Sequence, residues 1–232
     1  MRRFGLIIPI FALITLGTGH PVAAEPQSGA ASLSRLKAGN ERFVRGTSDP
    51  APIDASRRTV LAGGQEPFAM MLSCADSRVP PEHVFNVGLG DLFTIRTAGE
   101  VVDKSILASL EYGAEHLHIP LLVVMGHEAC GAVKAAAAKS DKSLGPNLDY
   151  MINAIRPATK RTKQDQAEVK DMILANVEEV INDLFEKSDA LRHAHDSGSL
   201  QVVGAYYDFT GRVVFSEPVT ARMTTAPAAG RH

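Results

Sequence analysis

The sequence FAMMLSCADSRVPP, residues 68–81, begins as an unbroken apolar run and turns polar after Cys74. An apolar run of this length, followed by turn-forming residues, is typical of a strand that is buried on both faces of a sheet. A second run, IPLLVVMGH (residues 119–127), has the same form and ends at His127. In a parallel sheet the ends of the two strands would lie along the same edge.

The remaining segments alternate between helical and extended patterns, which predicts an α/β fold with a mainly parallel central β-sheet flanked by helices. Ser32 is the expected N-cap of the first helix, and Gly46 its expected stop. The expected elements are a helix over 32–46, a short helix or turn within 57–67, a strand over 92–96, helices over 103–117 and 128–140, mostly helix over 147–191 with an interruption near Pro157, and a strand–turn–strand over 200–216.

Composition excludes some classes of partner. The chain has 232 residues, of which 45% are hydrophobic and 22% charged, as in an ordinary globular protein. Its net charge of -2 gives no reason to expect a nucleic acid or a polybasic contact with a membrane.

The N-terminus has the layout of a secretory signal peptide, with basic residues, a short apolar run and small residues at the cleavage site. An uncleaved membrane anchor is the alternative. The sequence predicts a signal peptide over 1–24, a flexible leader over 25–31, one domain over 32–216 and an irregular tail over 217–232. Cleavage removes Arg2 and Arg3, leaving a net charge of about -4, no membrane attachment and a periplasmic protein.

Export bears on the two cysteines of the chain, Cys74 and Cys130, because exported compartments favour disulfides. A disulfide, a pair of inert thiols and a metal site are the alternatives. Cys130 follows His127 by three residues, in the first turn of the expected helix, where the helix dipole favours a thiolate. Two cysteines, one histidine and an open fourth position form a catalytic zinc pattern.

Asp76 comes two residues after Cys74, and Arg78 comes two residues after Asp76. An arginine beside an aspartate keeps the carboxylate ionised and orients it through a two-pronged hydrogen bond. That carboxylate would accept a hydrogen bond from a metal-bound water, or bind the metal itself. An ordinary turn with a surface ion pair is the alternative.

These residues resemble those of the β-class carbonic anhydrases. The resemblance is carried by CADSRVPPE (74–82) and GHEACGAV (126–133), and extends to LKAGNERFVRG (36–46) and GDLFTIRTAG (90–99). It implies a zinc ion held by Cys74, His127 and Cys130, with the Asp76–Arg78 pair beside it. The implied reaction is the reversible hydration of carbon dioxide to bicarbonate and a proton by zinc-bound hydroxide.

The resemblance also implies an assembly. Gln65 would bind the substrate, often from the neighbouring subunit, in a homodimer or higher homo-oligomer that is embraced by the N-terminal helical arm. Some members close the site by binding the aspartate to zinc and hold regulatory bicarbonate against a tryptophan. Met71 occupies that tryptophan position, while Val79 and Tyr206 match the other two pocket positions. An open site without bicarbonate regulation is therefore expected.

Three rival functions follow from the same residues. The first is a non-catalytic exported module with a Cys74–Cys130 disulfide. The second is a hydrolase of carbonyl sulfide or carbon disulfide with the same metal. The third is a zinc-bearing relative without catalysis, against which the complete set of ligands and the Asp76–Arg78 pair argue.

Overall fold

The centre of the molecule is a five-stranded sheet with the strand order β2-β1-β3-β4-β5. The computed structural model describes residues 27–47, 53–138, 142–162 and 168–220. Strands β1 to β4 are parallel and β5 is antiparallel to β4. The strands are β1 (Ala69–Ser73), β2 (Leu92–Arg96), β3 (Leu121–His127), β4 (Gln201–Tyr207) and β5 (Val213–Phe215). The predicted α/β architecture is confirmed.

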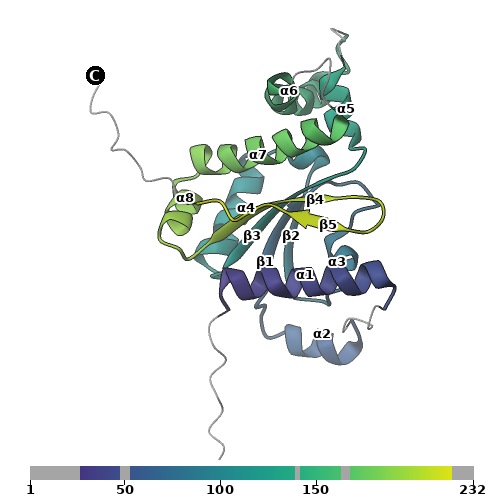
Figure 1. Cartoon of the computed structure of the whole chain (residues 1–232). Helices are drawn as coiled ribbons and strands as arrows, with labels where there is room; N and C mark the ends of the chain where they lie inside the picture. The colour runs from purple at the N-terminus through teal and green to yellow at the C-terminus, as the bar shows by residue number, and fades with distance from the viewer. Residues whose placement is uncertain (1–26, 48–52, 139–141, 163–167, 221–232) are drawn as a thin grey trace, which may run out of the picture.

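Helices cover both faces of this sheet (Figure 1). Helix α1 contacts β1 and β3 on one face, whereas α4 and α7 pack on the other face and α8 packs against both of them. The helices are α1 (Gly29–Arg45), α2 (Ala55–Leu61), α3 (Pro81–Val84), α4 (Lys104–Glu115), α5 (Gly131–Ala137), α6 (Pro146–Arg161), α7 (Val169–Lys187) and α8 (Asp189–Asp196), with a 3-10 turn η1 (Ala98–Glu100).

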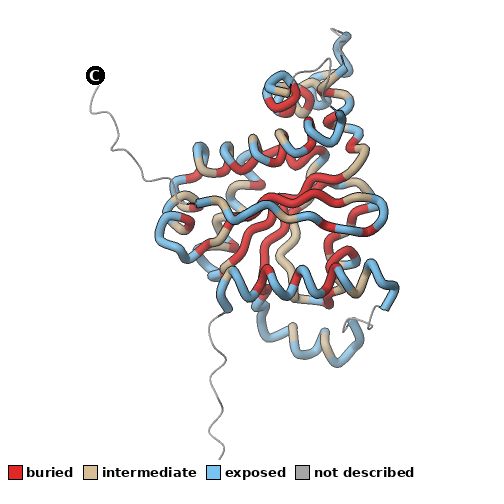
Figure 2. The backbone as a smooth tube through the Cα atoms, viewed as in Figure 1, coloured by how far each residue is buried: buried red, intermediate tan, exposed pale blue. Residues whose placement is uncertain are grey.

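The core follows the alternation of side chains along the strands. All residues of β1 and β3 are buried, and the buried strands form the middle of the molecule in Figure 2. Met71 and Val123 belong to the cluster that includes α1, while Met70 and Val124 belong to the cluster that includes α4. Burial on both faces explains why these strands read as continuous apolar runs.

The N-terminal helix α1 is locked onto the domain by two adjacent residues. A Cβ atom on Gly39 would lie 1.9 Å from the carbonyl oxygen of Phe85, so only glycine permits this approach. The buried side chain of Asn40 donates to the carbonyls of Val84 and Gly211, and its oxygen accepts from the N–H of Val213. The arm is therefore an integral part of the described fold.

Two predicted details of the helices are wrong. Helix α1 begins at Gly29 and is capped by Ser28, whereas Ser32 is buried inside it, so the last residues of the expected leader are helical. Helix α6 continues through Pro157 instead of breaking there. Pro157 and Asn153 are both exposed, so the Asn153 carbonyl that loses its hydrogen bond is open to water.

The expected signal peptide (1–24) and most of the expected tail lie outside the described residues. Residues 217–220, which are described, have no regular structure, although the Val219 N–H donates to the Val202 carbonyl. Among the helices of the described segments, none has the length and apolar character needed to cross a membrane.

Candidate metal centre

The topology of the sheet creates a site between the ends of β1 and β3. The chain leaves β1 for β2 on one side and leaves β3 for β4 on the other, so the strand order reverses between these two neighbours. Ligands in open α/β sheets bind at the carboxyl ends of strands at such a switch point. Ser73 is paired with Met125, which places Cys74 and His127 at this edge. The predicted meeting of the two strand ends is confirmed.

The Sγ atoms of Cys74 and Cys130 and a ring nitrogen of His127 all lie within 4.8 Å of one another. All three residues are buried, and both cysteines are free thiols. Among the described residues, the donor atoms of these three side chains are close enough together to hold a metal ion. The disulfide alternative is not what the structure shows.

His127 is oriented as a ligand would be. Its Nδ1 lies 2.9 Å from the Glu128 carbonyl oxygen, and because a carbonyl only accepts, Nδ1 carries the proton. Nε2 then presents its lone pair, yet it is fully buried and has no hydrogen-bond partner among the described residues. A buried polar atom without a partner is costly. A metal ion bound at Nε2 removes this cost, so the residues present fit such an ion.

The charge of the two sulfurs also fits a cation. The hydrogen bond from Cys130 lowers the pKa of Cys74 to about 4 against the opposing effect of burial, with smaller lowering contributions from His127 and then from the N–H groups of Gly99 and Asp76. The same contact, together with burial, raises the pKa of Cys130 well above its ordinary value. A second thiolate beside the first is therefore disfavoured, and a divalent metal ion would compensate the charge of both sulfurs.

A left-handed residue sets the spacing of His127 and Cys130. Ala129 has a φ of 56°, a conformation that costs a non-glycine residue about 1 kcal/mol or more. This turn ends β3, and α5 begins only at Gly131, with Cys130 as its N-cap. The expected helix over 128–140 is thus shorter, and Cys130 precedes its first turn instead of lying inside it.

Asp76 and Arg78 form the predicted two-pronged pair. Arg78 donates from Nε to Oδ1 at 2.9 Å and from Nη2 to Oδ2 at 2.6 Å. These hydrogen bonds lower the pKa of the Asp76 carboxyl well below its usual range, against a smaller opposing effect of burial. Oδ2 lies 3.9 Å from Nε2 of His127, so the carboxylate stands beside the three-residue cluster.

Arg96 holds the segment from Cys74 to Asp76 in place, although the sequence analysis did not single it out. Its Nε donates to the Cys74 carbonyl at 2.9 Å and its Nη2 to the Asp76 carbonyl at 2.5 Å. Arg96 is the last residue of β2. Its position at the carboxyl end of a parallel strand is a signal that could have identified it, as it identified Cys74 after β1.

Phe209 is a second residue that the sequence analysis missed. It lies in the turn between β4 and β5, with its ring centroid 4.4 Å from the guanidinium carbon of Arg78 and 6.4 Å from the His127 ring. The Glu128 carboxylate fixes this turn by accepting the Phe209 N–H at 2.9 Å. Nothing near Phe209 in the sequence signals this contact.

Gln65, the predicted substrate-binding residue, lies in the exposed segment between α2 and β1. Within the described part of this chain it makes no hydrogen bond with Asp76, Arg78 or the metal-ligand cluster. The role assigned to Gln65 in binding substrate stays a prediction.

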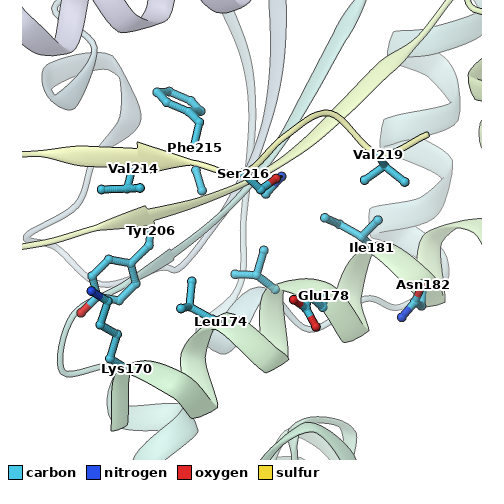
Figure 3. A pocket seen from close by; sticks show the side chains of 13 residues that line it. Lys170, Leu174, Glu178, Ile181, Asn182, Tyr206, Val214, Phe215, Ser216 and Val219 are labelled. Atoms are coloured by element: carbon cyan, nitrogen blue, oxygen red, sulfur yellow. The ribbon is translucent and has the colours of Figure 1, made fainter. Parts of the chain in front are cut away.

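A cavity of about 600 Å³ lies elsewhere, between α7 and the β4–β5 edge (Figure 3). Tyr206 lines it and Lys170 extends over the Tyr206 ring, with Nζ 5.3 Å from the centroid, but no metal-cluster residue lines it. Val79 is fully buried and does not line it either. Of the two positions that were matched to a regulatory bicarbonate pocket, Tyr206 lines this cavity and Val79 does not.

Comparison with known proteins agrees with this geometry. A family model described as carbonic anhydrase matches residues 69–213, a range that contains the cluster and the Asp76–Arg78 pair but not Gln65. Carbonic anhydrase 2 of Mycobacterium tuberculosis is 39% identical over 193 residues, which cover 82% of this chain and 93% of the relative. A carbonic anhydrase of Mycolicibacterium smegmatis is 36% identical over 187 residues, covering 79% and 91%.

Solved structures show the same fold. A Coccomyxa β-carbonic anhydrase in complex with acetazolamide has a TM-score of 0.66 and 29% identity over 81% of this chain and 88% of its own. A β-carbonic anhydrase of Sordaria macrospora, described as tetrameric, has a TM-score of 0.63 and 24% identity, over 82% of this chain and 97% of its own. β-Carbonic anhydrases use zinc, and the cysteine–histidine–cysteine group suits that ion. The chain belongs to the β-class carbonic anhydrase family, enzymes that interconvert carbon dioxide and bicarbonate.

Proposed function

We propose that this enzyme hydrates carbon dioxide to bicarbonate and a proton in a zinc-dependent reaction, with Cys74, His127 and Cys130 as the zinc ligands. The observation that carries the proposal is the buried imidazole of His127, whose Nε2 has no hydrogen-bond partner among the described residues and one of whose ring nitrogens lies within 4.8 Å of both cysteine sulfurs. Zinc in this position would supply Lewis acidity, which makes a water molecule acidic enough to give hydroxide near neutral pH.

The protein groups have separate tasks. Asp76 accepts a hydrogen bond from the reacting water and so directs its lone pair toward the carbon of carbon dioxide. Both oxygens of Asp76 accept hydrogen bonds from Arg78, which keep the carboxylate ionised and would compete with its direct coordination to a metal. The site is therefore of the open kind, with Asp76 outside the group of metal ligands. The Arg96 contacts hold the backbone of Cys74 and Asp76 at a fixed separation.

The substrate side is completed by a second copy of the chain. We propose a homodimer, or a larger assembly built from it, in which the partner's Gln65 binds substrate at this site. Helix α2, just before Gln65, buries none of its residues within the subunit, and Val60 on it is 70% exposed. Sedimentation analysis tests the assembly. A purely monomeric enzyme with full activity would contradict it.

We propose that the protein is exported to the periplasm after removal of residues 1–24. The basic, apolar and small-residue pattern of that segment supports this location. N-terminal sequencing of protein from the periplasmic fraction should begin near Glu25. Recovery of the full-length chain from the cytoplasm, or from the membrane as an anchored form, would contradict it.

The reaction is tested by stopped-flow hydration of carbon dioxide with purified zinc protein and a Cys74→Ser variant. The parent protein should be active and the variant should lose both zinc and activity. Hydrolysis of carbonyl sulfide or carbon disulfide, measured in parallel, separates the rival substrates. Fast hydrolysis of either of these without hydration of carbon dioxide would contradict the proposal.

A further inference from the structure

Glu100 combines two energetic costs at one position behind the metal centre. Its φ of 57° lies in the left-handed region, directly after Gly99 with a φ of 68°. Its side chain is only 1% exposed, and its Oε1 has no hydrogen-bond partner in the described structure. A strained, buried and incompletely paired acid costs stability, and such residues cluster where function requires them.

Asn176 on α7 is the group that bonds this carboxyl. Its Nδ2 donates to the Glu100 Oε2 at 3.2 Å and to the Gly99 carbonyl at 2.9 Å, which uses both of its N–H bonds. Asn176 itself is 2% exposed. The Asn176 amide thus connects the Gly99 backbone and the Glu100 side chain to helix α7, which is distant from them in the sequence.

This arrangement fixes a donor on a metal ligand. The N–H of Gly99 points at the Cys74 sulfur, with a nitrogen-to-sulfur distance of 3.5 Å. Packing limits the turn from the other side, because a Cβ on Gly99 would lie 2.5 Å from Ile155 Cδ1 and 3.0 Å from Ala132 Cβ. The direction of the Gly99 N–H is therefore set by Asn176 and Glu100 together with this packing.

We propose that Glu100 and Asn176 act as a clamp that holds the Gly99 N–H on the Cys74 sulfur and thereby tunes the metal centre. A hydrogen bond to a thiolate draws electron density from the sulfur, so the thiolate donates less charge to the metal. The metal then remains a stronger Lewis acid. Outer contacts of this kind orient metal ligands and adjust their basicity. Glu100 and Asn176 are thus positioning residues that act through Gly99 and Cys74.

The clamp is tested on the metal and not on turnover, so its failure is distinguishable from failure of the proposed reaction. Asn176→Ala removes both hydrogen bonds, and Glu100→Ala removes the side-chain acceptor. Glu100→Gln is the conservative variant, because its amide oxygen still accepts from Asn176. Ser188→Ala is the matched control, since it removes a buried hydroxyl that bonds Glu111 and Leu191 at the start of α8.

Two readouts are used on cobalt- and zinc-loaded protein. In Asn176→Ala and Glu100→Ala the sulfur-to-cobalt charge-transfer band should shift to lower energy, because the Cys74 thiolate donates more charge without the hydrogen bond. Zinc affinity, measured by chelator competition, should fall about 10- to 100-fold, because the Cys74 ligand is no longer held in position. Glu100→Gln and Ser188→Ala should retain the parent band and affinity. A folded Asn176→Ala protein with an unchanged band and affinity would overturn the proposal, as would a shift of equal size in Ser188→Ala.

A measurement on the unaltered protein keeps the proposal testable if the alanine variants do not fold. In protein loaded with cadmium-113 and labelled with nitrogen-15 at glycine, the Gly99 amide proton should show a scalar coupling to the metal, transmitted through the N–H···S bond. Absence of this coupling, with the Gly99 signal assigned, would overturn the proposal.

Discussion

The guanidinium of Arg78 lies against the ring of Phe209, with 4.4 Å between the guanidinium carbon and the ring centroid. The same guanidinium holds both oxygens of Asp76. Phe209, in the β4–β5 turn, therefore supports the Asp76–Arg78 pair, which follows β1 and lies beside the metal cluster. Arg78 is otherwise half-exposed, with 53% of its side chain accessible, so the ring restricts a residue that would have more freedom.

Replacing Phe209 by alanine should lower the hydration rate about two- to fivefold, because an exposed cation–π contact contributes about 0.5–1 kcal/mol to holding Arg78 in place. Phe209→Tyr keeps the aromatic face and is the control, with an expected rate near that of the parent. Stopped-flow hydration assays measure both. Equal rates in Phe209→Ala and the parent would show that the ring does not position Arg78.

Removing Arg78 should raise the pKa of Asp76, since the Arg78 hydrogen bonds are the main cause of its depression. In Arg78→Gln the carboxyl should titrate near its ordinary value of about 3.9, whereas in the parent it stays ionised to lower pH. Loss of bonds to a charged group should also slow hydration about 10- to 100-fold at neutral pH.

The Asp76 titration is followed by carbon-13 NMR of its carboxyl group. Arg35→Gln is the control, because Arg35 pairs with Asp91, away from the metal cluster. That variant should leave the Asp76 midpoint where it is in the parent. An unchanged midpoint in Arg78→Gln would mean that something other than Arg78 keeps Asp76 ionised.

Glu100 should make stability depend on pH. Burial, and then the charge of Cys74, raise the pKa of Glu100 well above 4.5. Between about 4.5 and the folded-state pKa, the unfolded chain releases a proton that the folded chain retains. Rising pH therefore removes stability from the parent by up to about 1.4 kcal/mol per pH unit in this window.

Glu100→Gln has no such titration. The free energy of unfolding of Glu100→Gln minus that of the parent should therefore increase as pH rises above about 4.5. Denaturant titrations at several pH values give this difference. A difference that does not vary with pH would show that Glu100 ionises as freely in the folded protein as in the unfolded chain.

The docking of α1 depends on Gly39. In Gly39→Ala the new methyl group would meet the carbonyl oxygen and carbon of Phe85 at 1.9 and 2.9 Å, and a backbone carbonyl cannot rotate away as a side chain can. The cost should be about 1–3 kcal/mol of unfolding free energy. Ser34→Ala, on the exposed side of the same helix, should leave stability nearly unchanged. Equal stability of the two variants would contradict the observed approach of α1.

The strands of the sheet and the cluster of Cys74, His127 and Cys130 could be predicted because local patterns identify the strands that carry these residues. The runs that end at Cys74 and His127 are apolar enough to identify strands buried on both faces, and parallel pairing then brings their ends together. The Asp76–Arg78 pair is two residues apart, so its geometry follows from a single turn. Local sequence identifies the strands and the Asp76–Arg78 pair, and the general geometry of parallel sheets brings the strand ends together.

The remaining features join distant segments and have no local signal. Glu100 and Asn176 are 76 residues apart, and the contact of Phe209 with Arg78 depends on how the β4–β5 turn reaches over the edge of the sheet. The left-handed conformation of Ala129 is imposed by its surroundings, since alanine does not favour it. At Pro157 a local rule gives the wrong prediction. Proline is expected to break the helix, but α6 continues because water can bond the exposed carbonyl that loses its hydrogen bond.

In the proposed site, two sulfurs and one imidazole hold a single zinc ion. Elemental analysis of native protein purified without chelators, combined with X-ray absorption at the zinc edge, tests it most directly. We expect one zinc per chain, with two sulfur ligands at about 2.3 Å and one nitrogen at about 2.0 Å. Active protein without stoichiometric zinc, or zinc without sulfur ligands, would contradict it.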